Sequence, residues 1–285
     1  PTSWRCGKDM ADLLLERYRQ EHGEYPRKLA LVVWGTSNMR TGGDDIAQAL
    51  WLWGCEPVWE ESSGRVVDFR ILPLSLFGRP RVDVLLRVSG LFRDAFGDTM
   101  RLLATVPKRL AQQDEPPELN PIREAWLRDR ESLVQQGLDS GEAIRRATLR
   151  VFSSQPGSYG TGLLPLIDAG NWSSKSDLTD VFCKWSGHAF DSDGTASEAI
   201  ELFRERLVET LAVPGRIEIV AHADGETAAL ERLRATEWDA LVLDLQLRQG
   251  TGIGVLRSLR AHRPAGVVVI VLTNYAIPQL RVKGF

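Results

Sequence analysis

A polar, glycine-containing stretch, WGTSNMRTGGDD at 34–45, carries the first residues that could do chemistry. It lies between an apolar run and an expected helix, an arrangement that often binds phosphate. The stretch lacks the GK[ST] ending of a P-loop and the GxGxxG pattern, so it does not predict a nucleotide site. Its charged residues, Arg40, Asp44 and Asp45, then need another explanation. The plainest one is that the two aspartates stabilise a helix N-terminus.

Two further charged stretches raise the same question. SGLFRDAF at 89–96 places Arg93 and Asp94 just past a buried strand, where residues commonly line ligand crevices in open α/β sheets. QDEPPELNP at 113–121 holds Glu115 in a short rigid segment. Helix capping and solvated loop charge also account for both stretches. On spacing alone that structural interpretation is favoured.

The composition is that of a globular protein with about two domains. The chain has 285 residues, a net charge of −3 and a pI near 5.9, so we expect neither a nucleic-acid partner nor a membrane surface. Three scattered cysteines without metal spacing favour a cytoplasmic protein with reduced thiols. The first residues do not form a signal peptide.

Hydrophobic periodicity predicts an α/β layout for the first 112 residues. Apolar residues at helical spacing, followed by glycine, predict two helices that end before Gly23 and Gly54. Short apolar runs predict the strands that those helices accompany. The expected strands are 29–35, 56–60, 66–74 and 82–90, and a further helix is expected over 96–112.

The middle of the chain is expected to be helical up to a long loop. Asn120 and Pro121 predict a helix start, and Asp139 with Glu142 forms a capping box before a helix over 143–152. The stretch 153–172 is dense in Gly, Pro and Ser and is expected to be a functional loop, followed by a short helix over 177–185. The polar stretch 190–199 is the best linker candidate.

From about residue 203 helices and strands alternate strictly. Helices are expected at 203–211, 225–235 and 252–262, and strands at 216–223, 239–247 and 266–274. This order predicts a parallel, doubly wound sheet with helices on both faces. We therefore predict two α/β domains, 1–195 and 196–285.

Five long motifs in the first domain resemble the large subunit of cobaltochelatase, within the cobalt/magnesium chelatase large-subunit family. They are the stretch from PTSWRCGKDM to GGDDIAQAL, GRPRVDVLLRVSGLFRDAF, DEPPELNPIR, RVFSSQPGSYGTGLLPLIDAGNW and DVFCKWSGHAF. Their order and spacing cover about residues 1–195. The WSGHAF and TSNMRTGGDD stretches resemble the cobalt enzyme more than the magnesium one, which remains the alternative.

This resemblance implies a chelatase-type α/β region that binds a tetrapyrrole, hydrogenobyrinic acid a,c-diamide, on the aerobic route to cobalamin. Co²⁺ would be the substrate metal, and separate AAA+ ATPase subunits would bind ATP, in a ligase-class reaction in the cytoplasm. Carboxylates can hold the metal and accept pyrrolic protons, and arginines can pair with ring carboxylates. Because family members are far longer, we expect this chain alone to be inactive.

The resemblance gives each candidate residue a role. The expected catalytic residues are Asp44, Asp45 and Glu115; the tetrapyrrole-binding residues are Arg40, Arg93, Tyr159 and Trp34; and the metal ligands are Asp94, Asp168 and His188.

The second domain resembles the receiver domain of response regulators, over about 203–280. DALVLDLQLRQGTGIGVLRSLRA places Asp244 where a receiver carries its phospho-acceptor, and GVVVIVLTN places Thr273 at the switch position. A receiver also needs an acidic pair after its first strand to hold Mg²⁺, and no apolar run precedes 203–211. We expect an incomplete, flavodoxin-like receiver. A two-component signalling protein that uses Asp244 is the alternative function.

Overall fold

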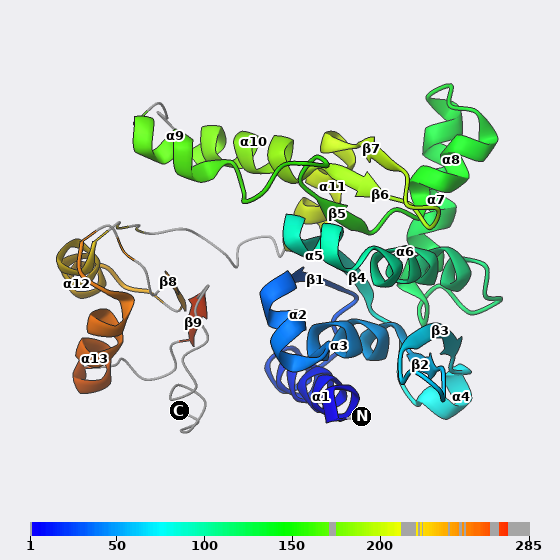
Figure 1. The fold of residues 1–285 in the computed structure, drawn as a ribbon, viewed down its shortest axis with the longest axis horizontal. Helices are drawn as coiled ribbons and strands as arrows, with labels where there is room; N and C mark the ends of the chain where they lie inside the picture. Colours follow the sequence, from blue (N-terminus) through cyan, green and yellow to red (C-terminus); the bar gives the residue numbers. More distant parts are fainter. Residues whose placement is uncertain are drawn as a thin grey trace. The chain divides into compact units, whose positions relative to one another are not determined.

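The computed structural model describes residues 2–170, 175–211, 221, 223, 225–238, 240–244, 247, 249–262 and 268–272. The chain divides into two compact units, 1–212 (unit 1) and 213–285 (unit 2), which are described separately. Figure 1 shows their elements. Both units are α/β, as the sequence predicts.

Unit 1 contains the following elements. Its helices are α1 (Thr2–His22), α2 (Gly35–Thr41), α3 (Asp44–Trp53), α4 (Leu74–Phe77), α5 (Gly90–Ala95), α6 (Gly97–Ala111), α7 (Pro121–Gln135), α8 (Ser140–Ala147), α9 (Leu163–Ala169), α10 (Lys175–Ser186) and α11 (Ile200–Leu211). Its strands are β1 (Lys28–Val33), β2 (Cys55–Trp59), β3 (Val66–Ile71), β4 (Asp83–Val88), β5 (Val151–Ser153), β6 (His188–Phe190) and β7 (Ala196–Glu198).

A five-stranded sheet in the order β1-β4-β5-β6-β7 organises unit 1. β1, β4 and β5 run parallel, and β6 and β7 join antiparallel at one side. All six residues of β4 are buried, as expected of a strand in the interior of a covered sheet. β2 and β3 form a separate antiparallel hairpin.

Helices cover both faces of this sheet. On one face α1, α3 and α6 bury a large core around Leu50, Trp53 and Leu86. On the other face α10 and α11 pack on β4, β5 and β6, where Phe203 of α11 lies 5.0 Å from Phe152, ring centre to ring centre. The sheet therefore lies between two helical layers.

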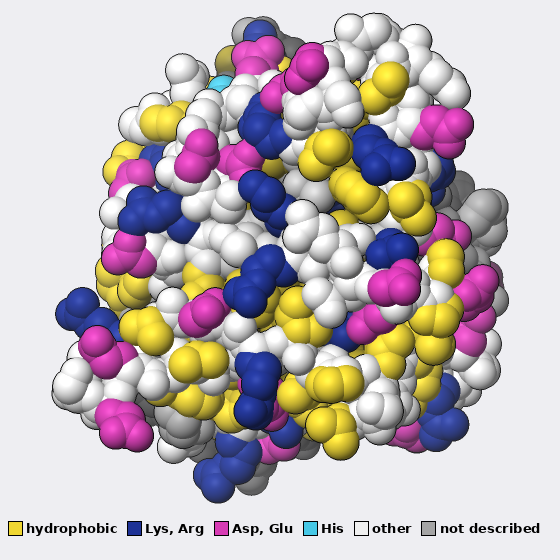
Figure 2. All heavy atoms as spheres, turned by 90° about the vertical axis from the view of Figure 1, so that its right-hand side faces the viewer, with side chains coloured by type: hydrophobic (Ala, Val, Ile, Leu, Met, Phe, Trp, Pro, Cys, Tyr) yellow, Lys and Arg dark blue, Asp and Glu magenta, His cyan; other side chains and the backbone are white. Residues whose placement is uncertain are grey.

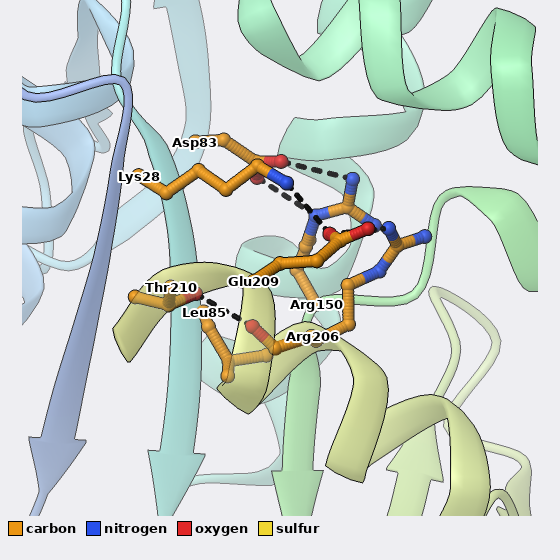
Figure 3. A pocket seen from close by; sticks show the side chains of 7 residues that line it. All are labelled: Lys28, Asp83, Leu85, Arg150, Arg206, Glu209 and Thr210. Atoms are coloured by element: carbon orange, nitrogen blue, oxygen red, sulfur yellow. Dashed lines mark hydrogen bonds and ion pairs between the residues drawn. The ribbon is translucent and has the colours of Figure 1, made fainter. Parts of the chain in front are cut away.

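Charged groups fix α11 at the amino ends of the strands (Figure 3). Lys28 Nζ lies 2.6 Å from Glu209 Oε2, and Arg150 binds both carboxylate oxygens of Asp83, with Nε 2.7 Å from Oδ1 and Nη2 3.0 Å from Oδ2. Arg206 lies beside them and pairs with Asp129 of α7. A cavity with about 10 Å³ of free space, room for roughly one water molecule, is lined by Lys28, Asp83, Arg150, Arg206 and Glu209, among others.

Most elements predicted from the sequence are confirmed. α1, α3 and α7 match the expected helices, and Gly23 and Gly54 end α1 and α3 with φ of 80° and 76°. β1, β2, β3 and β4 match the four expected strands of the first region. Asn120 caps α7 by accepting a hydrogen bond from the backbone N–H of Arg123 at 3.1 Å.

Four local predictions are wrong. The polar loop expected within 34–45 contains α2, because the extended Trp34 precedes it and the left-handed Gly42 ends it. Residues 151 and 152 leave the expected helix and form β5 together with Ser153, since these residues pair with β4 and β6. The expected loop over 153–172 contains α9. The proposed linker 190–199 is the β6–β7 turn and strand, paired through His188 and Glu198.

The first compact unit therefore extends beyond residue 195, where the sequence analysis placed the boundary between the two domains. β7 and α11 both pack within unit 1, so that unit extends to residue 212. The strand expected at 216–223 lies, apart from 221 and 223, outside the described residues.

Unit 2 has a parallel pair of strands with two helices. Its elements are α12 (Glu226–Ala235), β8 (Ala240–Asp244), α13 (Gly252–His262) and β9 (Val268–Leu272). β8 and β9 pair in parallel, from Ala240 with Val268 to Asp244 with Leu272. Leu243, Val255 and Leu259 form its small buried core. The parallel pairing confirms the alternation predicted for this region.

The surface mixes charges of both signs. On the side seen in Figure 2, acidic, basic and apolar side chains are interspersed, and several basic ones follow one another down the middle of the face. None of the helices that the structure describes is both long enough and apolar enough to cross a bilayer.

The Asp83–Arg150 pair gives a stability prediction. Asp83→Asn removes the counterion of an arginine that is only 1 % exposed, so we expect unfolding of unit 1 to become easier by about 3–5 kcal/mol. Asp98→Asn, whose side chain is 95 % exposed beside Arg101, should change it by less than about 1 kcal/mol. Urea unfolding followed by Trp fluorescence measures this, since eight of nine tryptophans lie before residue 212. Equal changes in the free energy of unfolding for the two substitutions would contradict the role of Asp83 as the counterion of buried Arg150.

Candidate functional site

The carboxyl ends of β1, β4 and β5 meet at one edge of the sheet. Trp34, Ser89 and Ser154 each follow one of these strands directly. The backbone ties them together, because the Ser89 N–H donates to Val33 O at 2.8 Å and the Ser153 hydroxyl donates to Val88 O at 2.9 Å. Such edges commonly bind ligands in open α/β sheets. We call this region the carboxyl edge.

Arg93 holds the loop that follows β5 against α5. Its Nη1 donates to Ser154 O and Gln155 O, both at 2.8 Å, and to Ser158 O at 3.2 Å. Its Nε and Nη2 donate to the two oxygens of Asp94 at 2.6 and 2.8 Å. Because all three of its nitrogens are engaged, Arg93 acts as a clamp for the loop.

Asp94 in turn orients Tyr159. The Tyr159 hydroxyl donates to Asp94 Oδ2 at 2.7 Å. Hydrogen bonding to Arg93 lowers the pKa of the Asp94 carboxyl, and the bond to Asp94 raises the pKa of the Tyr159 phenol. Tyr159 is 59 % exposed, so its ring is available at the carboxyl edge. Arg93, Asp94 and Tyr159, which the sequence suggests separately, are therefore brought together.

Two glycines permit this close packing. A Cβ on Gly90 would lie 2.7 Å from Ser158 O and 2.8 Å from Tyr159 Cδ1. A Cβ on Gly35 would lie 2.8 Å from the backbone nitrogen of Phe92. These distances are shorter than side chains tolerate, so α2, α5 and the loop after β5 can meet only through glycine.

Asp44 and Asp45 lie at the start of α3, just after α2. Thr41 Oγ1 donates to Asp44 Oδ1 at 2.5 Å, and the Asp45 N–H donates to the same oxygen at 2.9 Å. Burial and the Asp44 carboxylate raise the pKa of the Asp45 carboxyl to about 6, although Ser37 and Arg40 oppose this shift. A carboxylate with a pKa of this kind is a better proton acceptor near neutral pH than an ordinary aspartate.

The three expected metal ligands are not gathered into one site. His188 lies next to Ser153 across the β5–β6 pairing, at the carboxyl edge, and its Nδ1 is buried with no hydrogen-bond partner among the described residues. Asp94 is bonded to Arg93 and Tyr159, and Asp168 lies on α9. Among the residues that the structure describes, no group of three or more His, Cys, Asp or Glu side chains is arranged to hold a metal ion.

Glu115, in the segment between α6 and α7, lies at the other end of the sheet, beside Arg81, which precedes β4. Arg81, which is fully buried, donates to both Glu115 oxygens, at 2.7 and 2.5 Å, and Asn120 Nδ2 donates to Oε2 at 2.8 Å. Arg81 also donates to Leu72 O at 2.8 Å. Through these contacts Arg81 and Glu115 hold together the segment after β3, the segment before β4 and the start of α7. A catalytic role for Glu115 stays a prediction.

Sequence reasoning did not identify Arg87, which the structure places beside Trp34 near the carboxyl edge. Its guanidinium carbon lies 5.9 Å from the centre of the Trp34 ring, and its Nη2 donates to Gly160 O at 2.7 Å. The available signal was a single charged residue inside the apolar stretch VLLRV. A charge within an otherwise apolar, buried strand requires an explanation.

In unit 2, Asp244 is the last residue of β8 and pairs in register with Leu272 at the end of β9. Thr273, the expected switch residue, directly follows Leu272 in sequence and lies outside the described residues. The nearest acidic residues before α11 are Asp191, Asp193 and Glu198, and all three belong to the β6–β7 region of unit 1.

Comparison with protein families gives two overlapping matches. The family described as CobN/Magnesium Chelatase matches residues 1–218, and the Response regulator receiver domain family matches residues 198–285. The overlap, 198–218, contains α11, which packs within unit 1.

Three relatives illustrate the first match. The aerobic cobaltochelatase subunit CobN of Pseudomonas aeruginosa is 49 % identical over 213 residues, 75 % of this chain and 17 % of that protein. The chloroplastic magnesium-chelatase subunit ChlH of Oryza sativa subsp. japonica is 38 % identical over 66 % of this chain and 13 % of that protein. A solved structure, the catalytic subunit of cobaltochelatase from Mycobacterium tuberculosis, has a TM-score of 0.66 and 43 % identity, and the match covers 74 % of this chain and 17 % of that one. The chain thus spans about a sixth of such relatives.

The raised pKa of Asp45 predicts a pH-dependent stability. Between about pH 4 and 6 the folded chain holds a proton that the unfolded chain has lost, so folding stability falls as pH rises. Asp45→Asn removes this loss. We expect its urea midpoint to match wild type near pH 4 and to exceed it near pH 7.

The control is Asp9→Asn, which alters an exposed carboxylate on α1. The pH dependence of Asp45→Asn is compared with that of this variant at each pH. A stability gap for Asp45→Asn that narrows towards pH 7 would show that burial does not disfavour the charged carboxylate.

Proposed function

Because the chain belongs to the CobN/magnesium chelatase family, we propose that it is a fragment of a cobaltochelatase large subunit that binds a tetrapyrrole at its carboxyl edge. The observation that carries the proposal is the convergence of Trp34, Arg93, Asp94 and Tyr159 after three parallel strands. If the parent enzyme is a cobaltochelatase, the ring is hydrogenobyrinic acid a,c-diamide, an intermediate of aerobic cobalamin biosynthesis. A magnesium chelatase-type subunit is the alternative.

The exposed aromatic side chains supply the apolar contact for a flat ring. Trp34 and Tyr159 are 38 % and 59 % exposed, which is high for aromatic residues beside a core. Arg93 keeps Tyr159 in place through Asp94, so it positions the site instead of binding the ring directly. Arg40, in the last turn of α2, remains the candidate for a ring carboxylate.

Metal insertion replaces two pyrrolic protons by Co²⁺, so the site needs a proton acceptor. Asp45 suits this task best among the carboxylates, since its pKa of about 6 lets it exist in both forms near neutral pH. Asp44 keeps it in place through the bond between Asp44 Oδ1 and the Asp45 N–H. His188 is the candidate to contact the metal substrate, because its Nδ1 has no partner among the described groups.

ATP would be bound by separate AAA+ subunits, consistent with a sequence that carries no P-loop motif. Since the chain spans about a sixth of its relatives, completion of the ligase-type reaction requires further protein. We therefore propose ring binding, without turnover, as the activity of this chain.

We propose no phosphotransfer by unit 2. In a receiver, the segment before α11 would supply a strand and the acidic pair that holds Mg²⁺. Here that segment is β6–β7, which is bonded into the sheet of unit 1. Asp244 stays a predicted phospho-acceptor, and the signalling alternative rests on its position at the end of β8.

A titration tests ring binding. We expect hydrogenobyrinic acid a,c-diamide to quench Trp fluorescence saturably. Trp34→Leu should weaken binding roughly 3- to 10-fold because an aromatic contact is lost. Trp59→Leu is the matched control, since Trp59 lies on the separate β2–β3 hairpin and packs against Trp4 of α1.

Saturable quenching by protoporphyrin alone would favour the magnesium alternative. Absence of quenching by either ring would remove the proposed function, and equal losses in the two variants would remove the carboxyl edge as the site.

A further inference from the structure

Five arginines of unit 1 are almost fully buried, and one of them differs from the rest. Their exposed fractions are at most 6 %, and the residues are Arg81, Arg87, Arg93, Arg150 and Arg206. Four pair with carboxylates: Glu115, Asp94, Asp83 and Asp129. Arg87 has no carboxylate within ion-pair distance among the residues that the structure describes.

The contacts of Arg87 leave its charge uncompensated. Nη2 donates to Gly160 O at 2.7 Å, and Nε is buried with no acceptor among the described groups. Burial lowers the pKa of this guanidinium, but arginine stays charged near neutral pH. A buried charge without a partner destabilises a fold by several kcal/mol, so its presence points to a ligand that supplies the missing anion.

The surroundings show from which side such a ligand could come. Arg87 pairs in register with Val32 of β1, so both side chains lie on the same face of the sheet. Val32 is 52 % exposed although it belongs to a sheet, and the neighbouring Trp34 is 38 % exposed. β1 is the first strand of the sheet order, and α11 covers only part of this face. The guanidinium thus adjoins an open apolar surface.

We propose that Arg87 binds a carboxylate of a flat apolar ligand that lies over Val32 and Trp34. The inference rests on the proposed function and deepens it, because the ligand class is a tetrapyrrole with free carboxylate side chains. The apolar ring packs on Trp34 and Val32. One carboxylate reaches the guanidinium, where a charge-assisted hydrogen bond replaces the missing counterion. Arg87 then selects acidic rings over neutral ones.

The test compares two rings and three proteins, all as the full 285-residue chain. The rings are hydrogenobyrinic acid a,c-diamide and its methyl-esterified form, which lacks carboxylates. The proteins are wild type, Arg87→Met, which keeps an unbranched apolar stem but removes the guanidinium and its charge, and Arg101→Met. Arg101 of α6 is the control, since its side chain is 48 % exposed and, unlike that of Arg87, pairs with a carboxylate, that of Asp98.

We expect Arg87→Met to weaken binding of the free acid about tenfold or more, and to leave binding of the ester unchanged. Its urea midpoint should equal or exceed that of wild type, because an uncompensated buried charge has been removed. Arg87→Lys should retain part of the preference for the acid, as it keeps the charge but loses the planar fork.

Equal binding of acid and ester by wild type, unchanged in Arg87→Met, would overturn the inference and leave ring binding itself intact. A lowered urea midpoint in Arg87→Met, with equal losses for both rings, would show that Arg87 only tethers the loop at Gly160 and would also overturn it. Failure of wild type to bind either ring would overturn the proposed function together with this inference.

Discussion

The structure of unit 1 depends on how it accommodates buried guanidinium groups. A buried arginine must find anions or carbonyl oxygens, and several of these partners come from distant parts of the chain. At the amino ends of the strands, Arg81 joins Glu115 to the segments after β3 and α3, and Arg150 joins Asp83. At the carboxyl ends, Arg93 joins α5 to the loop after β5. The requirement that these charges be satisfied fixes connections that apolar contacts alone would leave loose.

The two ends of the sheet consequently differ in what they can do. At the amino ends the carboxylates are committed to arginines, and the cavity there has room for roughly one water molecule. At the carboxyl ends of the parallel strands lie the exposed rings of Trp34 and Tyr159 and, within β4, Arg87, which has no carboxylate partner among the described residues. A carboxyl with a raised pKa, that of Asp45, lies at the start of α3. A flat, acidic ligand that must lose protons and gain a metal ion suits this second set of groups. The first set holds the framework, including α11, in place through Lys28 and Glu209.

The sequence predicts the framework well where the signal is local. The strands, the glycine stops of α1 and α3 and the cap of α7 follow from spacing and from residue type. Placing Arg93 and Asp94 after a strand also located the carboxyl edge. Non-local pairing was beyond the same reasoning. Glu115 is acidic and close to a proline pair, but its partner Arg81 is 34 residues away, so its structural contacts are visible only in the fold. The 190–199 stretch has the composition of a linker and is ordered by pairing of β6 with β5 and β7. Arg87 is notable because no carboxylate pairs with it in the described part of the chain, and a sequence alone does not show which charged residues remain without a counterion.

The central claim is that a tetrapyrrole binds at the carboxyl edge of unit 1. Amide hydrogen exchange of the full chain, with and without saturating hydrogenobyrinic acid a,c-diamide, tests it most directly, because exchange reports protection segment by segment. The account predicts slower exchange in 34–41, 89–95 and 154–160 when the ring is present, and unchanged exchange in 113–120 at the amino ends of the strands. Protection confined to other segments, with those three unaffected, would contradict it.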